Sequence, residues 1–220
     1  VEENNNPTLQ RANSLKRIEL SYNEHFNAIR DANDDDFIML SDNDEIPNLN
    51  SEDFKKNKND IVIFNQLFFY FKFNLLYDRM LWPGTKGCKK KNLKSFSWLR
   101  NIKFKKYPIW RIDTYFSNTK YSNLNIINDG GWHFTNLKSP EDMFEKFMNF
   151  GHHDEFKLSG ITVDKIRDKI SKREMFYDHF ADKSSKNKWN SDYKLKKIDT
   201  DLLPRYLASN REKYLEWFDI

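Results

Sequence analysis

Apolar residues recur at helical spacing near the start of the chain and at strand-like spacing further on. Between residues 9 and 30 they lie three or four positions apart, which predicts an amphipathic helix. Phe37–Leu40 is a continuous apolar run, which predicts a strand buried on both faces. Residues 61–77 are rich in β-branched and aromatic side chains and predict one long strand or two. From residue 69 onward, aromatic and polar positions alternate there, which indicates a strand with two unlike faces.

Turn and capping residues divide the remainder of the chain. Pro83-Gly84 and Lys86-Gly87 predict turns. Ser139-Pro140 is a helix start, with Ser as the N-cap and Pro in the first helical position. Further elements are expected as follows: short helices or loops at 51–59 and 92–101, strands at 110–116 and 123–128, and helices at 139–150, 162–180 and 202–218, with a polar linker at 183–188. This order predicts an α/β fold that binds ligands at the carboxyl ends of its strands.

Composition narrows the class of protein. The 220 residues contain 37 basic and 33 acidic side chains, a net charge of +4, and 16% are aromatic. The aromatic rings provide a core, and the mild charge fits an anionic ligand such as a nucleotide without requiring nucleic acid. A lone cysteine, Cys88, excludes an internal disulfide and suits a reducing compartment. No stretch resembles a membrane span or a signal peptide, and the first residue is Val1, so we expect a trimmed or partial chain without stable membrane insertion.

The acidic string after the predicted strand 37–40 is the strongest chemical signal. Asp42 and Asp44 lie two positions apart, followed by Glu45 and Pro47. Where the backbone turns, two such carboxylates can converge on one hard cation such as Mg²⁺ or Mn²⁺. A metal there would neutralise charge on a leaving nucleoside diphosphate. The alternative interpretation is a solvated acidic turn.

Two later motifs carry histidine. Asp129-Gly130-Gly131 precedes Trp132 and His133, where paired glycines permit close approach of a ligand and the indole can stack on a sugar. The alternative is a hairpin turn with a core tryptophan. Further on, His153 and Glu155 follow the helix that starts at Ser139. They can supply a metal ligand or a general base, or they can simply cap that helix.

Basic runs and the cysteine give weaker signals. Lys89–Lys91 and Lys103–Lys106 can bind phosphate or RNA, but we favour solvated loops. Cys88 lies in no reactive motif, and a buried thiol is favoured over a nucleophile.

Taken in order, three motifs resemble glycosyltransferase family 17, which includes the bisecting N-acetylglucosaminyltransferase and many microbial and viral relatives. They are Ser-Asp-Asn-Asp-Glu-Ile-Pro at 41–47, Gly-Trp-His-Phe-Thr at 131–135, and Lys146 followed by His-Asp-Glu-Phe at 153–156. Gln10-Arg11 also matches the family pattern, so the similarity spans about residues 9–156.

The resemblance implies a GT-A-type nucleotide-sugar fold with a mixed central sheet and C-terminal helices, a divalent metal, and inverting sugar transfer. The donor that it implies is UDP-N-acetylglucosamine and the acceptor is a glycan. On this basis the metal, Mn²⁺ or Mg²⁺, would be held by Asp42, Asp44 and His153. The implied donor-binding residues are Arg11, Asp42, Asp44, Trp132, His133 and Lys146. Glu155, Glu45 and Asp129 are the candidates for the base that takes the acceptor proton.

Family members carry further strands before the Gln-Arg helix, so the resemblance implies a transferase domain over 1–160 that lacks its N-terminal strands. Residues 161–220 would form a helical extension. A cytoplasmic enzyme of a microbe or virus is expected, with no nucleic-acid partner. Two alternatives stay open: a noncatalytic transferase-like fragment, and a basic module that binds glycan or nucleic acid without turnover.

Overall fold

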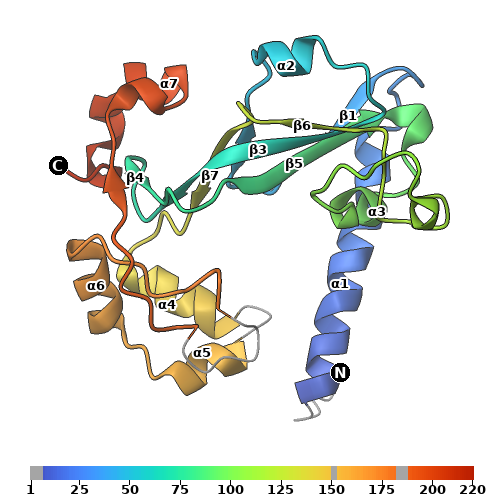
Figure 1. Ribbon diagram of the computed structural model, residues 1–220. Helices are drawn as coiled ribbons and strands as arrows, with labels where there is room; N and C mark the ends of the chain where they lie inside the picture. The colour runs from blue at the N-terminus through green and yellow to red at the C-terminus, as the bar shows by residue number, and fades with distance from the viewer. Residues whose placement is uncertain (1–6, 150–152, 182–187) are drawn as a thin grey trace. The chain divides into compact units, whose positions relative to one another are not determined.

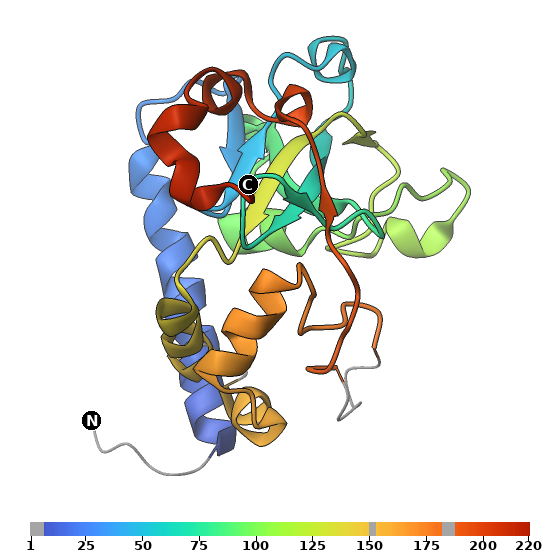
Figure 2. The same cartoon turned by 90° about the vertical axis from the view of Figure 1, so that its left-hand side faces the viewer.

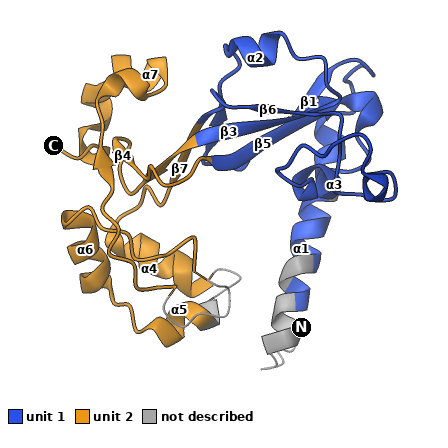
Figure 3. Ribbon diagram, viewed as in Figure 1, with its two compact units in different colours: residues 1–66, 82–131 blue, residues 67–81, 132–220 orange. Residues whose placement is uncertain are grey.

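The computed structural model describes residues 7–149, 153–181 and 188–220 (Figures 1 and 2). The chain is a mixed α/β protein, and within these residues eight strands belong to one mixed sheet. It divides into two compact units that are discontinuous in sequence, residues 1–66 with 82–131 and residues 67–81 with 132–220 (Figure 3). The expected boundary near residue 160 stays a prediction. No helix in the described part of the chain is long and apolar enough to cross a membrane.

The first unit is built on a mixed arrangement of strands, with antiparallel and parallel pairs. β5 pairs with β1 from Phe37↔Lys89 to Leu40↔Lys86, and its other edge pairs with β3. β6 lies parallel to β3 on the opposite side, from Ile61↔Leu124 to Phe64↔Ile127. The elements of this unit are α1 (Pro7–Ala28), β1 (Phe37–Leu40), β2 (Glu45–Pro47), α2 (Glu52–Lys55), the start of β3 (Ile61–Tyr70), β5 (Trp82–Lys89), η1 (Lys90–Asn92), α3 (Phe96–Asn101), η2 (Ile112–Thr114) and β6 (Leu124–Ile127).

The core of the first unit covers both faces of its strands, but β1 is fully buried on one face only: Ile38 and Leu40 are buried, while Phe37 and Met39 are half-buried. One face packs against α3, and the members of that cluster are Ile38, Leu40, Ile61, Ile63, Cys88, Phe96, Leu99, Ile102 and Leu124. The other face holds Val62, Phe64 and Ile127, with Phe54 of α2 packed on them. Burial raises the pKa of the Cys88 thiol to about 12, with a smaller contribution from Asp60, so this cysteine is a core residue and not a nucleophile.

The second unit continues from β3. β7 runs parallel to β3 from Leu67↔Trp132 to Tyr70↔Thr135, and β4 pairs with β8. Its elements are β4 (Leu75–Leu76), β7 (Gly131–Thr135, whose first residue belongs to the first unit), α4 (Pro140–Asn149), α5 (His153–Ser159), α6 (Val163–Ser171), β8 (Lys196–Lys197), η3 (Thr200–Leu202), α7 (Arg205–Ser209) and η4 (Arg211–Trp217). The predicted polar linker at 183–188 lies outside the described residues except for Lys188.

The predicted alternation along residues 69–74 is wrong. Phe69, Tyr70 and Phe71 are all buried, so β3 is covered on both faces. The strand ends at Tyr70, and the next residue, Phe71, adopts a left-handed backbone conformation with φ 67°. Phe69 stacks on Phe134, while Phe68 lies on the other face among different aromatic rings.

Three further sequence predictions are corrected. Residues 82–89 form strand β5 where Pro83-Gly84 and Lys86-Gly87 predict turns. Residues 110–116 form a turn and the short helix η2 in place of a strand. Helix α6 begins at its Thr162 cap as expected but ends at Ser171, well before residue 180.

Candidate functional site

The acidic string after β1 folds into a tight turn. The Glu45 amide donates to the Asp42 carbonyl at 3.1 Å, and the Asp42 amide donates to Glu45 Oε2 at 3.2 Å. Just before the turn, Ser41 Oγ lies 2.6 Å from Thr85 Oγ1 of β5, which fixes the end of β1. The turn therefore holds Asp42 and Glu45 at the carboxyl end of a buried strand, as the sequence predicts.

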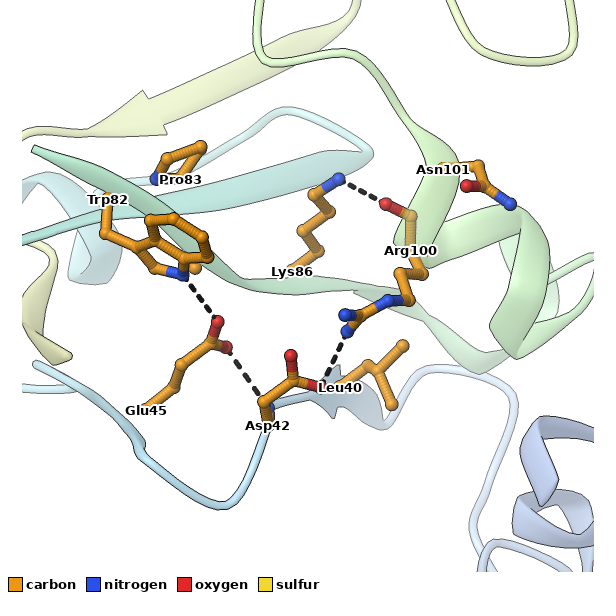
Figure 4. Close-up of a pocket in the computed structure, with 9 residues that line it drawn as sticks. Leu40, Asp42, Glu45, Trp82, Pro83, Lys86, Arg100 and Asn101 are labelled. Carbon is orange, nitrogen blue, oxygen red and sulfur yellow. Dashed lines mark hydrogen bonds and ion pairs between the residues drawn. The ribbon is translucent and has the colours of Figure 1, made fainter. Parts of the chain in front are cut away.

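Asp42 and Glu45 both line a pocket of about 200 Å³ in the first unit (Figure 4). The pocket lies between the acidic turn, β5 and the end of α3, and its lining residues are Leu40, Asp42, Glu45, Trp82, Pro83, Gly84, Lys86, Arg100 and Asn101. Arg100 Nη1 donates to Asp42 Oδ1 at 2.6 Å, and Trp82 Nε1 donates to Glu45 Oε1 at 2.9 Å. Two carboxylates and two cationic side chains thus share one small concave site.

Lys86 is the least solvated cation of the pocket. Its ammonium donates to the Ile102 carbonyl at 2.6 Å and also to the Arg100 carbonyl. Burial, together with the positive charge of Arg100, lowers the pKa of Lys86 to about 8. Lys86 is therefore a cation at neutral pH that loses its charge within a mildly alkaline range.

Arg100 joins the pocket to α1. Burial lowers the pKa of its guanidinium, but the hydrogen bond and charge of Asp42 outweigh burial and raise it. The guanidinium carbon lies 5.5 Å from the ring centroid of Tyr22 in α1. Burial is also the main reason that the pKa of Tyr22 is raised. Arg100 is therefore a fixed positive charge held between an aromatic ring and a carboxylate.

A divalent cation fits the donor chemistry of this turn only in part. The described residues contain no group of three or more His, Cys, Asp or Glu side chains placed to hold a metal. Asp42 and the half-buried Asp44 are carboxylates at the same turn. Mg²⁺ in phosphate-binding enzymes is typically held by one or two carboxylates together with substrate phosphates. Of the two carboxylates at this turn, Asp42 lines the pocket and is bound to Arg100, whereas Asp44 is not among the residues that line it.

The predicted Asp129-Gly130-Gly131 break lies against the segment that follows β2. Asn48 Nδ2 donates to Asp129 Oδ2 at 2.8 Å, and the Asn48 amide donates to the Gly130 carbonyl at 3.0 Å. Gly131 has a φ of 109°, and a Cβ there would lie 2.1 Å from the Ile46 carbonyl oxygen. The glycines therefore serve close backbone packing within the first unit.

Trp132 and His133 belong to β7 in the second unit. Trp132 Nε1 donates to the Leu202 carbonyl at 2.6 Å, and its ring packs on the cluster around Phe134. His133 is buried, and its ring stacks on Phe68 with 4.8 Å between centroids. Both side chains thus make structural contacts, but Trp132 is only half-buried and β7 pairs with β2 and β3 and not with β6, so the segment is not the hairpin with a core tryptophan that the alternative describes.

Two other predicted residues have partners within the second unit, and two cannot be assessed. Lys146 donates to Asn136 Oδ1 at 2.8 Å, and Glu155 forms an ion pair with the buried Lys188. Arg11 lies in α1 and His153 begins α5, but their side chains are outside the described residues.

Sequence reasoning missed three pocket residues, Trp82, Lys86 and Arg100. Trp82 and Lys86 lie in a segment where the sequence predicts turns, and Arg100 lies in a short predicted helix far along the chain. Lys86 is a half-buried charged residue between buried positions of β5, and a lysine is rarely placed next to a core.

Comparison with models of protein families, with curated proteins and with solved structures finds no match for this chain. Fold and site alone therefore define the class: a mixed α/β protein with a small pocket of mixed charge at the carboxyl end of a sheet strand.

Proposed function

We propose that this chain is a metal-dependent inverting glycosyltransferase. It would move a sugar, N-acetylglucosamine by the family resemblance, from a nucleotide-sugar donor to a glycan hydroxyl. The observation that carries the proposal is the pocket, in which the acidic turn after β1 faces Lys86 and Arg100. A nucleoside diphosphate is an anionic ligand, and cationic side chains bind its phosphate oxygens through charge-assisted hydrogen bonds.

Asp42 and Asp44 are the residues that would hold Mn²⁺ or Mg²⁺. When bound, the metal supplies a Lewis acid that stabilises negative charge on the leaving diphosphate. Arg100 binds Asp42 at 2.6 Å, and its planar guanidinium can instead make paired hydrogen bonds to phosphate oxygens. Lys86 adds a point charge to the same pocket.

Glu45 is the base candidate that lines this pocket. In an inverting transfer, the acceptor oxygen attacks the anomeric carbon, the bond from that carbon to phosphate oxygen breaks, and the diphosphate leaves with the bonding electrons. The acceptor proton passes to a carboxylate. Trp82 and the Asp42 amide orient the Glu45 carboxylate, whereas Glu155 is ion-paired with Lys188 in the second unit. Asp129, bound to Asn48, is the remaining candidate.

The test is release of nucleoside diphosphate from a panel of nucleotide sugars, with Mn²⁺ present and after chelation. We expect turnover that requires the metal, and at least a hundredfold loss in Asp44→Ala. Asp53→Ala is the matched control, because Asp53 is an exposed aspartate on α2 of the same unit, and it should keep full turnover. Undiminished turnover in Asp44→Ala would refute the metal assignment.

A second candidate is a noncatalytic transferase-like chain. The ion pairs Asp42–Arg100 and Glu155–Lys188 favour it, because both already satisfy carboxylates that catalysis would use. Nucleotide-sugar binding without turnover by the folded chain would select this candidate.

A further inference from the structure

The segment after α3 forms a folded projection from the first unit, which we call the 103–121 projection. It is drawn in light green in Figures 1 and 2, where it extends away from the strands of its unit in both views. Its two ends are hydrogen-bonded to each other: the Lys103 amide donates to the Thr119 carbonyl at 2.8 Å, and the Tyr107 amide donates to the Tyr121 carbonyl at 3.2 Å. The Tyr107 side chain is buried. The projection therefore has a fixed base.

The far end of the projection exposes large apolar side chains. The members of this exposed set are Ile109 (72% exposed), Trp110 (84%), Ile112 (72%), Tyr115 (69%) and Phe116 (87%). They lie within eight consecutive residues, and the Tyr115 hydroxyl donates to the Ile109 carbonyl at 3.2 Å, which ties the two ends of the set together. A single exposed apolar residue needs no explanation, but a contiguous set of this size marks an interaction surface.

Positive charge is concentrated on the same projection. It carries five basic residues, Lys103, Lys105, Lys106, Arg111 and Lys120, and one acidic residue, Asp113, so its formal charge is 5 − 1 = +4. The whole chain also has a formal charge of +4, which leaves the rest of the chain with no net charge. Asp113 binds Arg111 and Lys120 at 2.6 and 2.7 Å, and the three lysines at the base are exposed.

A hollow lies beside the exposed set. It has a volume of about 320 Å³ and is bordered by Lys94 and Lys120 together with Tyr115, Phe116 and Tyr121. Its surface thus combines ammonium groups with aromatic rings, and it opens next to the exposed apolar tip. This is a suitable place for the phosphate of a lipid headgroup.

We propose that the 103–121 projection docks the protein onto an anionic membrane surface. Tryptophan, tyrosine and phenylalanine side chains favour the headgroup region, where their rings leave water, and lysines nearby attract anionic lipids. The exposed set and the lysines belong to the same short projection, 19 residues long. Docking of this kind is peripheral and needs no membrane-spanning helix. It does not depend on the proposed transferase activity.

The first test is cosedimentation of the full chain with vesicles of phosphatidylcholine alone or with about 30% phosphatidylserine. We expect binding to the anionic vesicles that weakens as salt is raised, with little binding to the neutral ones. Trp110→Ala/Phe116→Ala should lose at least tenfold in partition coefficient. Leu158→Ala, which removes an equally exposed apolar side chain from α5, should leave it unchanged.

The charge contribution is tested separately. Lys105→Gln/Lys106→Gln should weaken partitioning by roughly fivefold for each charge removed. Lys55→Gln/Lys56→Gln removes two exposed charges from the end of α2 and the residue that follows it, in the same unit, and should have no effect. Brominated lipids should quench the fluorescence of Trp110. Because the chain has six tryptophans, the Trp110 signal is taken as the difference in fluorescence between the wild-type chain and Trp110→Ala.

Equal binding to neutral and anionic vesicles, or unchanged binding by the Trp110→Ala/Phe116→Ala variant, would overturn the proposal. Absence of vesicle binding by the folded wild-type chain would overturn it too, as would tight, tip-dependent binding of single-stranded RNA in its place. Turnover plays no part in these measurements, so their failure leaves the transferase proposal standing.

Discussion

Glu45 and Glu155, two candidates for the general base, differ in the contacts of their carboxylates. Glu45 accepts from Trp82 and from a backbone amide and faces the pocket, while Glu155 is ion-paired with a buried lysine. We therefore expect Glu45→Gln to lower kcat at least a hundredfold, since a general base contributes that much. Glu155→Gln should lower it less than tenfold. Steady-state kinetics on both variants decide, and the opposite ranking would assign the base to Glu155.

Lys86 gives the pocket a pH dependence. Because burial lowers its pKa to about 8, the ammonium deprotonates as the pH rises through that value. Affinity for UDP, measured by titration calorimetry, should fall up to about tenfold between pH 7 and pH 9. Lys86→Gln should bind weakly and without this slope. Lys89→Gln changes a lysine at the exposed end of the same strand and should keep the fall in UDP affinity between pH 7 and pH 9. If Lys89→Gln abolished that fall, a group other than Lys86 would cause it.

His179 makes the second unit sensitive to acid. Its ring lies against Phe68, and its Nε2 is 3.4 Å from the Tyr70 hydroxyl. Burial lowers the pKa of His179 to about 4, below the ordinary 6.5. Between these values the unfolded chain binds the additional proton, so stability is complete above about pH 6.5 and falls as the pH drops toward 4.

The loss linked to His179 is at most about 3 kcal/mol over that interval. Urea denaturation at several pH values should show it. His179→Phe should flatten the slope, whereas His25→Phe, at an exposed position of α1, should not. An unchanged slope in His179→Phe would mean that another group causes the acid sensitivity.

Among single residues, the local acidic motif after β1 predicts the place of some side chains of the pocket but not of others. Asp42 and Glu45 line one pocket, because a short turn after β1 fixes them through neighbours only a few residues away, whereas Asp44 of the same turn is not among the lining residues. Arg100 is 58 residues from Asp42, and no local pattern connects the two. The contacts of His133 with Phe68 likewise depend on the pairing of β7 with β3.

Among the elements, the incorrect predictions have identifiable physical causes. The glycines of β5 serve close packing and not turns, since a Cβ at Gly84 would lie 2.0 Å from Gln66 Oε1 and one at Gly87 would lie 2.4 Å from the Phe37 ring. The apolar residues near 110–116 lack a partner strand in the described chain and form the exposed end of the 103–121 projection. In both segments, tertiary packing and not local secondary structure explains why these residue types occur.

Helix α6 ends through a cap that its sequence conceals. Arg173 adopts φ 58°, the Glu174 amide donates to the Lys169 carbonyl at 2.8 Å, and the Arg173 amide donates to the Ile170 carbonyl at 3.0 Å. These are the two hydrogen bonds of a Schellman cap, which normally contains glycine at the left-handed position. Because arginine occupies it here, the apolar spacing beyond residue 171 predicted a longer helix.

Close packing of the 129–131 segment yields a stability prediction. A Cβ at Gly130 would lie 2.4 Å from the Asn65 backbone nitrogen and 2.6 Å from its carbonyl oxygen. Gly130→Ala should therefore destabilise the protein by about 1–3 kcal/mol, because backbone atoms must move. Gly160→Ala, where no atom lies within 4 Å, should cost about 1 kcal/mol, through its positive φ alone. Denaturant unfolding of both variants measures which substitution lowers the free energy of unfolding more. An unchanged free energy of unfolding in Gly130→Ala would contradict this packing.

For the whole molecule, the fold class was predictable and the division into units was not. The order of helix, buried strand, acidic turn, strands and helices identified an α/β protein, and the mixed sheet with C-terminal helices agrees with it. The units are discontinuous because β5 and β6 return to pair with β1 and β3. Such pairings join residues tens of positions apart, and spacing within a window cannot specify them.

The proposed function itself depends on one property of the molecule, that the acidic turn and its facing cations bind a metal and a diphosphate together. Titration calorimetry of UDP with and without Mn²⁺ measures this directly, with Asp44→Ala and Asp53→Ala as the matched pair. We predict binding to the wild-type chain and to Asp53→Ala that is at least tenfold tighter with Mn²⁺, and no such gain in Asp44→Ala. UDP affinity that is the same with and without Mn²⁺ in the folded wild-type chain would contradict the account.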